Sequence, residues 1–251
     1  MLSGLVGVGR DLGYLDPDQI SMDAVKVPKV LVGATKAGPP GLHREFDEDE
    51  SAFRVDRLLL PGTERIDVLT AELADPYRTM ARLAAHGGMR WGELAALRVS
   101  AVDLDARTIH VARALAEDTN GAIWLQLPKN RHTRTTFYPA FLASDMAAAV
   151  TAARSRGEAD PLVFPAARGG FLRRSNFGRR HWRPAHARAG WADPWTFHTL
   201  RHCAAVWMIY DQHYDLPDVA AVLGHADATI TQRVYVQPRE GVAERLANRA
   251  S

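Results

Sequence analysis

The stretch "FHTLRHCAAVWMIYDQHYDLPDVAAVLGHADATITQRVY", residues 197–235, decides the fold, because nearly all of it follows a helical pattern. Its apolar spacing predicts three successive helices, over 199–212, 216–223 and 228–236. Gly224 is the expected stop of the second helix, and Asp227 is the expected N-cap of the third. A segment with so many helices predicts a mainly helical domain.

Helices are also expected upstream of this stretch. Asp75 and Pro76 are the expected N-cap and first residue of a helix whose apolar residues recur at helical spacing as far as Gly87. Two more helices are predicted over 141–156 and 175–188. Pro184 is expected to kink or divide the second of these, because proline cannot donate a backbone hydrogen bond.

Segments rich in β-branched and aromatic residues predict three strands, at 108–113, 123–127 and 135–138. These strands are expected to pair as a small three-stranded antiparallel sheet on one side of the helices. The predicted fold class is therefore α+β and mainly helical.

The chain of 251 residues divides into three parts. Residues 60–251 carry the helix and strand patterns and are predicted to form the compact domain. Residues 31–59 combine glycine, proline and an acidic run, which indicates a flexible linker. Residues 1–30 predict a short helix and an extended connector, too small a segment to bury a core of its own.

The net charge of the chain is less informative about a binding partner than the distribution of charged residues along the sequence. The chain has 31 Lys and Arg against 29 Asp and Glu, and the resulting net charge of +2 does not by itself indicate nucleic acid. From Arg168 to Arg188, however, there are seven arginines and no acidic residue. This segment predicts a basic face, with an ordinary solvated helix surface as the alternative.

Cys203 is the only cysteine, which excludes an internal disulfide and a paired-cysteine metal site. A reducing compartment is the simplest setting for such a chain. No apolar run approaches the roughly 18 residues of a membrane span, and the N-terminus lacks the pattern of a secretory leader. We therefore expect a cytoplasmic protein without membrane association.

Unusual polar residues stand in five separate pieces of the chain. They are Arg90 and Glu93 in "GGMRWGELAAL", Lys129 in "LPKNRHTRTTFYP", His198 and Arg201 in "FHTLRH", His225 in "VLGH" and Tyr235 in "ATITQRVY". In this order and spacing, including the ten residues from His225 to Tyr235, they resemble the tyrosine recombinase (phage integrase) family. The resemblance covers residues 64–246.

The resemblance implies the catalytic-domain fold of that family and recombination or integration of double-stranded DNA. Tyr235 would be the nucleophile that cleaves and rejoins DNA through a 3′-phosphotyrosyl intermediate, with neither metal nor other cofactor. A tyrosine hydroxyl has a reference pKa of about 10 and needs a base. His198 is expected to be that general base, and Lys129 the general acid that protonates the departing 5′ oxygen.

The remaining predicted residues bind or orient the phosphate. Arg90 and Arg201 would each offer two donors to its non-bridging oxygens, where charge accumulates in the transition state. His225 would donate a hydrogen bond to a phosphate oxygen, and Glu93 would orient its neighbours. Five clustered arginines are expected to contact DNA phosphates elsewhere, namely Arg173, Arg174, Arg179, Arg180 and Arg183.

Members of the family usually carry a helical core-binding domain ahead of the catalytic domain. Residues 1–30 resemble the last helix and connector of such a domain, so the chain is expected to have a shortened one. Fewer phosphates would then be neutralised, and DNA binding is expected to be weak and steeply salt-dependent. Assembly on DNA, as a homotetramer, is expected through the tail that follows Tyr235.

Two other functions remain open from the residues alone. A catalytically impaired, DNA-binding remnant of an integrase would keep the fold and lose the chemistry. A zinc-dependent hydrolase could use His198, His202 and His225, but Thr199 stands where a zinc protease helix carries glutamate. In the recombinase interpretation, His202 is a helper that supports the site. The alternative for the turn that contains Lys129 is an ordinary exposed turn without a catalytic role.

Overall fold

The computed structural model describes residues 60–118, 120–128, 133–191 and 195–236. The predictions for 1–30, for 31–59, for the tail after 236 and for Lys129 lie outside these residues. Within them, the protein is mainly helical with a small antiparallel sheet, as the sequence predicts. None of the described helices is both long and apolar enough to cross a membrane.

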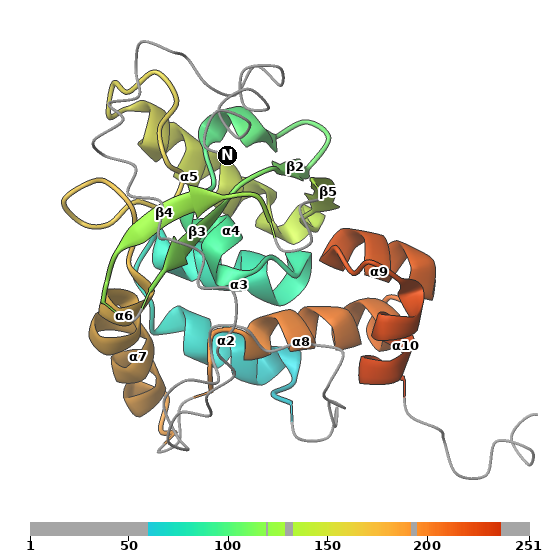
Figure 1. Ribbon diagram of the computed structural model, residues 1–251. Helices are drawn as coiled ribbons and strands as arrows, with labels where there is room; N and C mark the ends of the chain where they lie inside the picture. The colour runs from blue at the N-terminus through green and yellow to red at the C-terminus, as the bar shows by residue number, and fades with distance from the viewer. Residues whose placement is uncertain (1–59, 119, 129–132, 192–194, 237–251) are drawn as a thin grey trace, which may run out of the picture.

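The core forms where two helices from distant parts of the sequence pack together. They are α3 (Tyr77–Gly87) and α8 (Thr199–Val206), with α2 (Thr63–Ala71) against α3. Met80 and Leu200 are fully buried between these elements. This packing brings the turn after α3 close to the first turns of α8 (Figure 1).

Helix α3 confirms the predicted stop and corrects the predicted start. Gly88 ends the helix in the left-handed region, at φ 66°, which glycine adopts without strain. The N-cap is Pro76, not Asp75. The Asp75 carboxylate instead accepts a hydrogen bond from the Thr79 hydroxyl at 3.1 Å.

The strands pair differently from the prediction. The three-stranded antiparallel sheet has the order β1-β2-β5, and the other two strands form a separate antiparallel pair, β3-β4. The bounds are β1 (Val102–Asp103), β2 (Thr108–Val111), β3 (Ala114–Glu117), β4 (Ile123–Gln126) and β5 (Arg134–Phe137). The prediction that 123–127 belongs to the larger sheet is therefore wrong.

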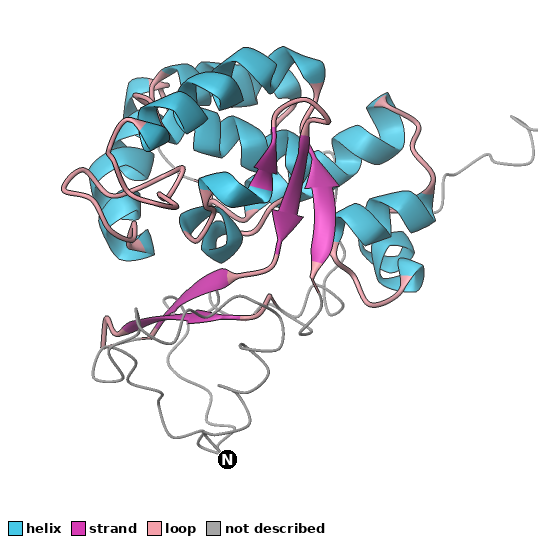
Figure 2. Cartoon of the chain, turned by 90° about the horizontal axis from the view of Figure 1, so that it is seen from above, coloured by secondary structure: helices cyan, strands magenta, loops and turns pink. Residues whose placement is uncertain are grey.

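Two physical reasons account for this arrangement. Strand β2 already pairs with β1 on one side and β5 on the other, so it offers no free edge to β4. Ile109 and Val111 of β2 are buried, whereas Leu125 of β4 is 41% exposed. Strands β3 and β4 make an arm that projects from the helical body, away from the three-stranded sheet (Figure 2).

The predicted helix over 175–188 is divided into three parts. They are α6 (Arg174–Phe177), the π-helical segment η7 (Gly178–Trp182) and α7 (Arg183–Arg188). Pro184 lies in the first turn of α7, where its missing N–H costs least, and the wider π turn directly precedes it. The helix over 141–156 appears as the 3-10 turn η6 (Ala140–Leu142) followed by α5 (Ala143–Arg154).

Residues 197–235 fold as predicted, with one irregularity. Helix α8 continues into a π-helical segment, η8 (Trp207–Asp211), and is followed by α9 (Leu216–Leu223) and α10 (Ala228–Tyr235). Gly224 ends α9 at φ 71°. Asp227 caps α10 by accepting a hydrogen bond from the Thr229 amide at 2.9 Å.

Candidate active site

Arg201 lies at the centre of the site, because α8 carries it into the space between the ends of two other helices. Its side chain is buried, with the residue 1% exposed. One terminal nitrogen donates to the Gly88 carbonyl at 2.5 Å, and the other donates to the Leu223 carbonyl at 2.8 Å. The guanidinium therefore joins the C-terminal ends of α3 and α9, where helix carbonyls lack partners within their own helix.

Glu93 is the buried anion of the site. It lies in α4 (Trp91–Ala95), with its side chain 1% exposed. Its carboxylate accepts from the Arg90 amide at 2.8 Å and from the Arg90 guanidinium at 3.4 Å. These contacts hold the Arg90 main chain and guanidinium against Glu93 at the start of α4.

A second arginine, Arg134 of β5, neutralises Glu93 more closely than Arg90 does. Its two terminal nitrogens donate to the two Glu93 oxygens, both at 2.7 Å. Burial raises the pKa of the Glu93 carboxyl, but the charges of Arg134, Arg90 and Arg201 and the Arg134 hydrogen bonds outweigh it and lower the pKa to about 2. The carboxylate is therefore ionised at any physiological pH.

Sequence reasoning missed Arg134, although strand parity could have indicated it. Thr136 is buried, and residues two apart in a strand share a face, so Arg134 points to the same buried side. Its Nε donates to the Val222 carbonyl at 2.8 Å. A Cβ on Gly224 would lie 2.8 Å from the Arg134 side chain, so glycine there permits the close approach of α9 to β5.

Tyr235 ends α10 with its side chain inside the protein, since the residue is 1% exposed. Its hydroxyl lies 2.9 Å from Nδ1 of His202. The Tyr210 hydroxyl donates to the Tyr235 carbonyl at 3.0 Å, which holds the end of α10 against η8. The rings of His198 and His202 meet edge to face, with centroids 4.8 Å apart.

His225 is also a neighbour of Tyr235. The two rings are nearly parallel, at an interplanar angle of 6° and a centroid distance of 6.4 Å. His225 Nδ1 is 2.7 Å from the buried Thr231 hydroxyl, and its amide donates to the Ala220 carbonyl at 3.0 Å. The C-terminal turn of α9 and the body of α10 therefore orient this imidazole together.

The sequence profile of the phage integrase family matches residues 64–241 of the chain. The chain belongs to this family. A comparison with curated protein sequences gives no match.

Solved structures of integrases and recombinases share the fold of this family member. The Tn1549 transposon integrase in complex with circular intermediate DNA aligns with a TM-score of 0.63 at 15% identity, over 78% of this chain and 68% of that chain. The XerA recombinase gives 0.58 at 19% identity, over 77% and 65%. XerH bound to its difH substrate gives 0.55 at 19% identity, over 75% and 53%. The phage integrase family chain therefore spans about two thirds or less of the length of these proteins.

Seven residues are predicted for the catalytic centre, and six of them lie in the described part of the chain. The charges of Arg90 and Arg201 both act on the Glu93 carboxylate and help to lower its pKa. Arg201 is in addition bound to the Gly88 carbonyl and to the end of α9. Of the remaining three, His198 and Tyr235 each make a ring contact with His202, and the His225 ring stacks beside the Tyr235 ring. Lys129 lies outside the described residues.

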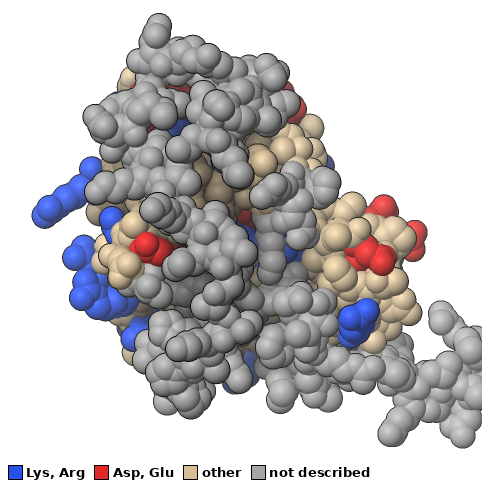
Figure 3. Space-filling view, in the orientation of Figure 1, with Lys and Arg blue, Asp and Glu red and all other residues tan. Residues whose placement is uncertain are grey.

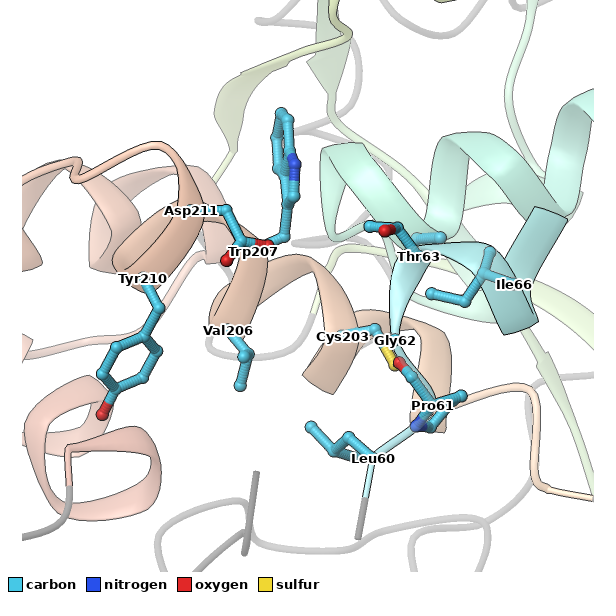
Figure 4. A pocket seen from close by; sticks show the side chains of 11 residues that line it. Leu60, Pro61, Gly62, Thr63, Ile66, Cys203, Val206, Trp207, Tyr210 and Asp211 are labelled. Carbon is cyan, nitrogen blue, oxygen red and sulfur yellow. The ribbon is translucent and has the colours of Figure 1, made fainter. Parts of the chain in front are cut away.

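The histidines do not form a metal-binding group in the described residues. No three His, Cys, Asp or Glu side chains there are grouped so that they could hold a metal ion. Cys203 faces a different space, a cavity of about 220 Å³ between the start of α2 and the α8–η8 helix (Figure 4). Burial raises the pKa of its thiol to about 12, so this integrase-family chain keeps its cysteine protonated.

The predicted DNA-contacting arginines of this phage integrase family chain fall into two groups. Arg173 donates to the Gly121 carbonyl and lies 3.9 Å from Glu117, so it joins α6 to the β3–β4 arm. Arg174 is half-buried beside it. The other three are exposed on η7 and at the start of α7, namely Arg179, Arg180 and Arg183. Figure 3 shows Lys and Arg side chains gathered on the edge of the molecule where Figure 1 places α6 and α7.

Proposed function

We propose that this chain cleaves and rejoins double-stranded DNA, with Tyr235 as the nucleophile and a 3′-phosphotyrosyl intermediate. The observation that carries the proposal is the arrangement of one buried tyrosine, three histidines and two arginines, drawn from four separate segments of the chain. The Tn1549 integrase and XerH were solved with DNA, which supports the same class of partner here. Assembly as a tetramer on DNA belongs to the proposal as well.

The chemistry follows from the charges that the site supplies. A phosphodiester under attack becomes five-coordinate, and negative charge accumulates on its non-bridging oxygens. Arg201 is fixed at the helix ends, and Arg90, whose side chain is 17% exposed, lies where an incoming phosphate could reach it. His225, whose ring lies beside the Tyr235 ring at a centroid distance of 6.4 Å, would complete the set of donors.

Arg134 makes this use of Arg90 possible. Glu93 needs a cation because it is buried, and Arg134 meets both of its oxygens at 2.7 Å, against 3.4 Å for Arg90. The charge of Glu93 is therefore largely compensated without the Arg90 guanidinium. In the proposal, Arg90 donates to the phosphate from its guanidinium, which also donates to Glu93 at 3.4 Å, while its main-chain amide stays bound to the Glu93 carboxylate.

Tyr235 Oη forms a bond to phosphorus, the bond from phosphorus to the 5′ oxygen breaks, and the departing oxygen takes a proton, for which Lys129 is the proposed donor. The phenolic proton passes to a histidine base. Rejoining reverses each step with a second 5′ hydroxyl. The phosphotyrosyl link conserves the energy of the broken bond, so the cycle needs no nucleotide cofactor.

The test is covalent capture on a nicked duplex, from which the short strand diffuses away after cleavage. A pool with randomised sequence around the nick is incubated with the full chain, and adducts that survive denaturation are enriched. The wild-type chain should form an adduct that Tyr235→Phe abolishes. Tyr214→Phe is the matched control, because Tyr214 is 42% exposed and the change removes the same hydroxyl. A wild-type chain that binds duplexes without forming any adduct would contradict the proposal and support the DNA-binding alternative.

A further inference from the structure

A histidine outside the residues predicted for catalysis contacts the hydroxyl of the proposed nucleophile. His202 Nδ1 lies 2.9 Å from Tyr235 Oη, within hydrogen-bonding distance. The two residues come from different helices, α8 and α10, and their ring centroids are 5.8 Å apart. We propose that His202 is a catalytic residue, the base that accepts the phenolic proton of Tyr235 during strand cleavage. This inference rests on the proposed function of Tyr235.

The position of His202 suits this role because both partners are held in place. Tyr235 is 1% exposed, so water does not compete freely for its proton. The Tyr210 hydroxyl fixes the carbonyl of Tyr235, which limits how far the end of α10 can move from His202. On α8, the next residue before His202 is Arg201, which is anchored to two helix ends. The donor and acceptor are therefore aligned before DNA binds.

The proton balance specifies one tautomer. Nδ1 must carry a lone pair to accept the phenolic proton, so neutral His202 carries its hydrogen on Nε2. As Tyr235 Oη bonds to phosphorus, the proton moves to Nδ1 and His202 becomes a cation. In rejoining, the same imidazolium returns the proton to Tyr235 as the phosphotyrosyl bond breaks. No other reactant is required.

The neighbouring His198 packs against His202 and has a different role in the proposal. Its ring meets the His202 ring edge to face at 4.8 Å, so it packs directly against the proposed base. In this arrangement His198 positions the His202 ring, and His202 accepts the proton. The division of roles is testable, because only a proton acceptor becomes dispensable when the tyrosine is made more acidic.

The experiment uses the full chain and a nicked duplex enriched by covalent capture with the wild-type protein. His202→Asn keeps an acceptor oxygen near the position of Nδ1 but removes the basic group. It should slow adduct formation by about 10²- to 10⁴-fold, the usual contribution of a general base. His110→Asn, the same change at an exposed histidine of β2, should leave the rate unchanged.

The decisive comparison replaces Tyr235 with a ring-fluorinated, more acidic tyrosine in each background. The fluorinated residue should recover most of the rate lost in His202→Asn and much less of the rate lost in His198→Asn. Equal rates for wild type and His202→Asn, or better recovery in the His198→Asn background, would overturn the role of His202 and leave the nucleophile intact. Absence of an adduct with the wild-type chain would instead refute the proposed function, and the inference with it. If His202→Asn does not fold, His202→Gln provides the second variant for the same comparison.

Discussion

Glu93→Gln tests the electrostatic arrangement beneath the site. The substitution leaves Arg134, whose side chain is 8% exposed, without the carboxylate that meets both of its terminal nitrogens. Removing one partner of a buried ion pair typically costs about 3–5 kcal/mol, because the remaining charge stays desolvated. We expect Glu93→Gln to lower the free energy of unfolding by this amount.

The pKa of Glu93 leads to a similar magnitude by a separate route. The pKa falls from its usual 4.5 to about 2 in the folded protein, and each unit corresponds to about 1.4 kcal/mol. The pair therefore contributes roughly 3 kcal/mol at neutral pH. Because the folded-state pKa is the lower one, this stabilisation is complete above the unfolded-state pKa of 4.5 and is lost as the pH falls towards 2.

The assay is urea denaturation of the full chain between neutral pH and pH 3, for wild type and variant. The loss of stability in Glu93→Gln should shrink as the pH falls below 4.5, because Glu93 of the unfolded wild-type chain then takes up a proton that the folded protein does not bind. Glu72→Gln is the control, because the Glu72–Arg188 pair is 35% and 53% exposed and should contribute no more than about 1 kcal/mol. If Glu93→Gln costs no more than the control, or costs the same at every pH, the argument for a buried and compensated carboxylate is wrong.

Two further predictions concern packing and DNA binding. Gly88→Ala should lower the free energy of unfolding by about 1–3 kcal/mol more than Gly157→Ala, as thermal unfolding would measure. Both glycines have positive φ, but of the two only Gly88 would bring its new Cβ against a side chain, that of Leu223 at 2.5 Å. Equal losses would contradict the close packing of the end of α3 on α9. Reversing the charge of Arg179 and Arg180 together should weaken binding to all duplexes alike. It should also reduce the slope of log binding constant against log salt concentration by about 0.9 per lost phosphate contact, as fluorescence anisotropy would measure. Arg154→Glu on α5 is the control and should change neither quantity. An unchanged slope would remove these two arginines from the DNA interface.

The helices of the C-terminal part could be predicted because their signals are local. Gly224 adopts the positive φ that its place after α9 requires, and Asp227 caps α10 with its own side chain. His213 lies at φ 57°, in the left-handed conformation, between η8 and α9. Each of these features depends on a few neighbouring residues, so one sequence is enough to locate it.

The strand pairing and two contacts of the site, Arg134 with Glu93 and His202 with Tyr235, could not be predicted, because they join distant segments of the chain. The partner of β4 is β3, whose sequence "ALAE" lacks the β-branched residues that indicate a strand. Arg134 contacts Glu93 across 41 positions of the chain. His202 and Tyr235 lie 33 positions apart, and helical spacing alone does not reveal which histidine reaches the hydroxyl.

The most direct measurement is the chemical identity of the residue that becomes joined to DNA. The captured adduct should be digested with protease and nuclease, and the remaining peptide sequenced by tandem mass spectrometry. We predict a nucleotide attached through its 3′ phosphate to the hydroxyl of Tyr235. An adduct on any other side chain, or one joined through a 5′ phosphate, would contradict it.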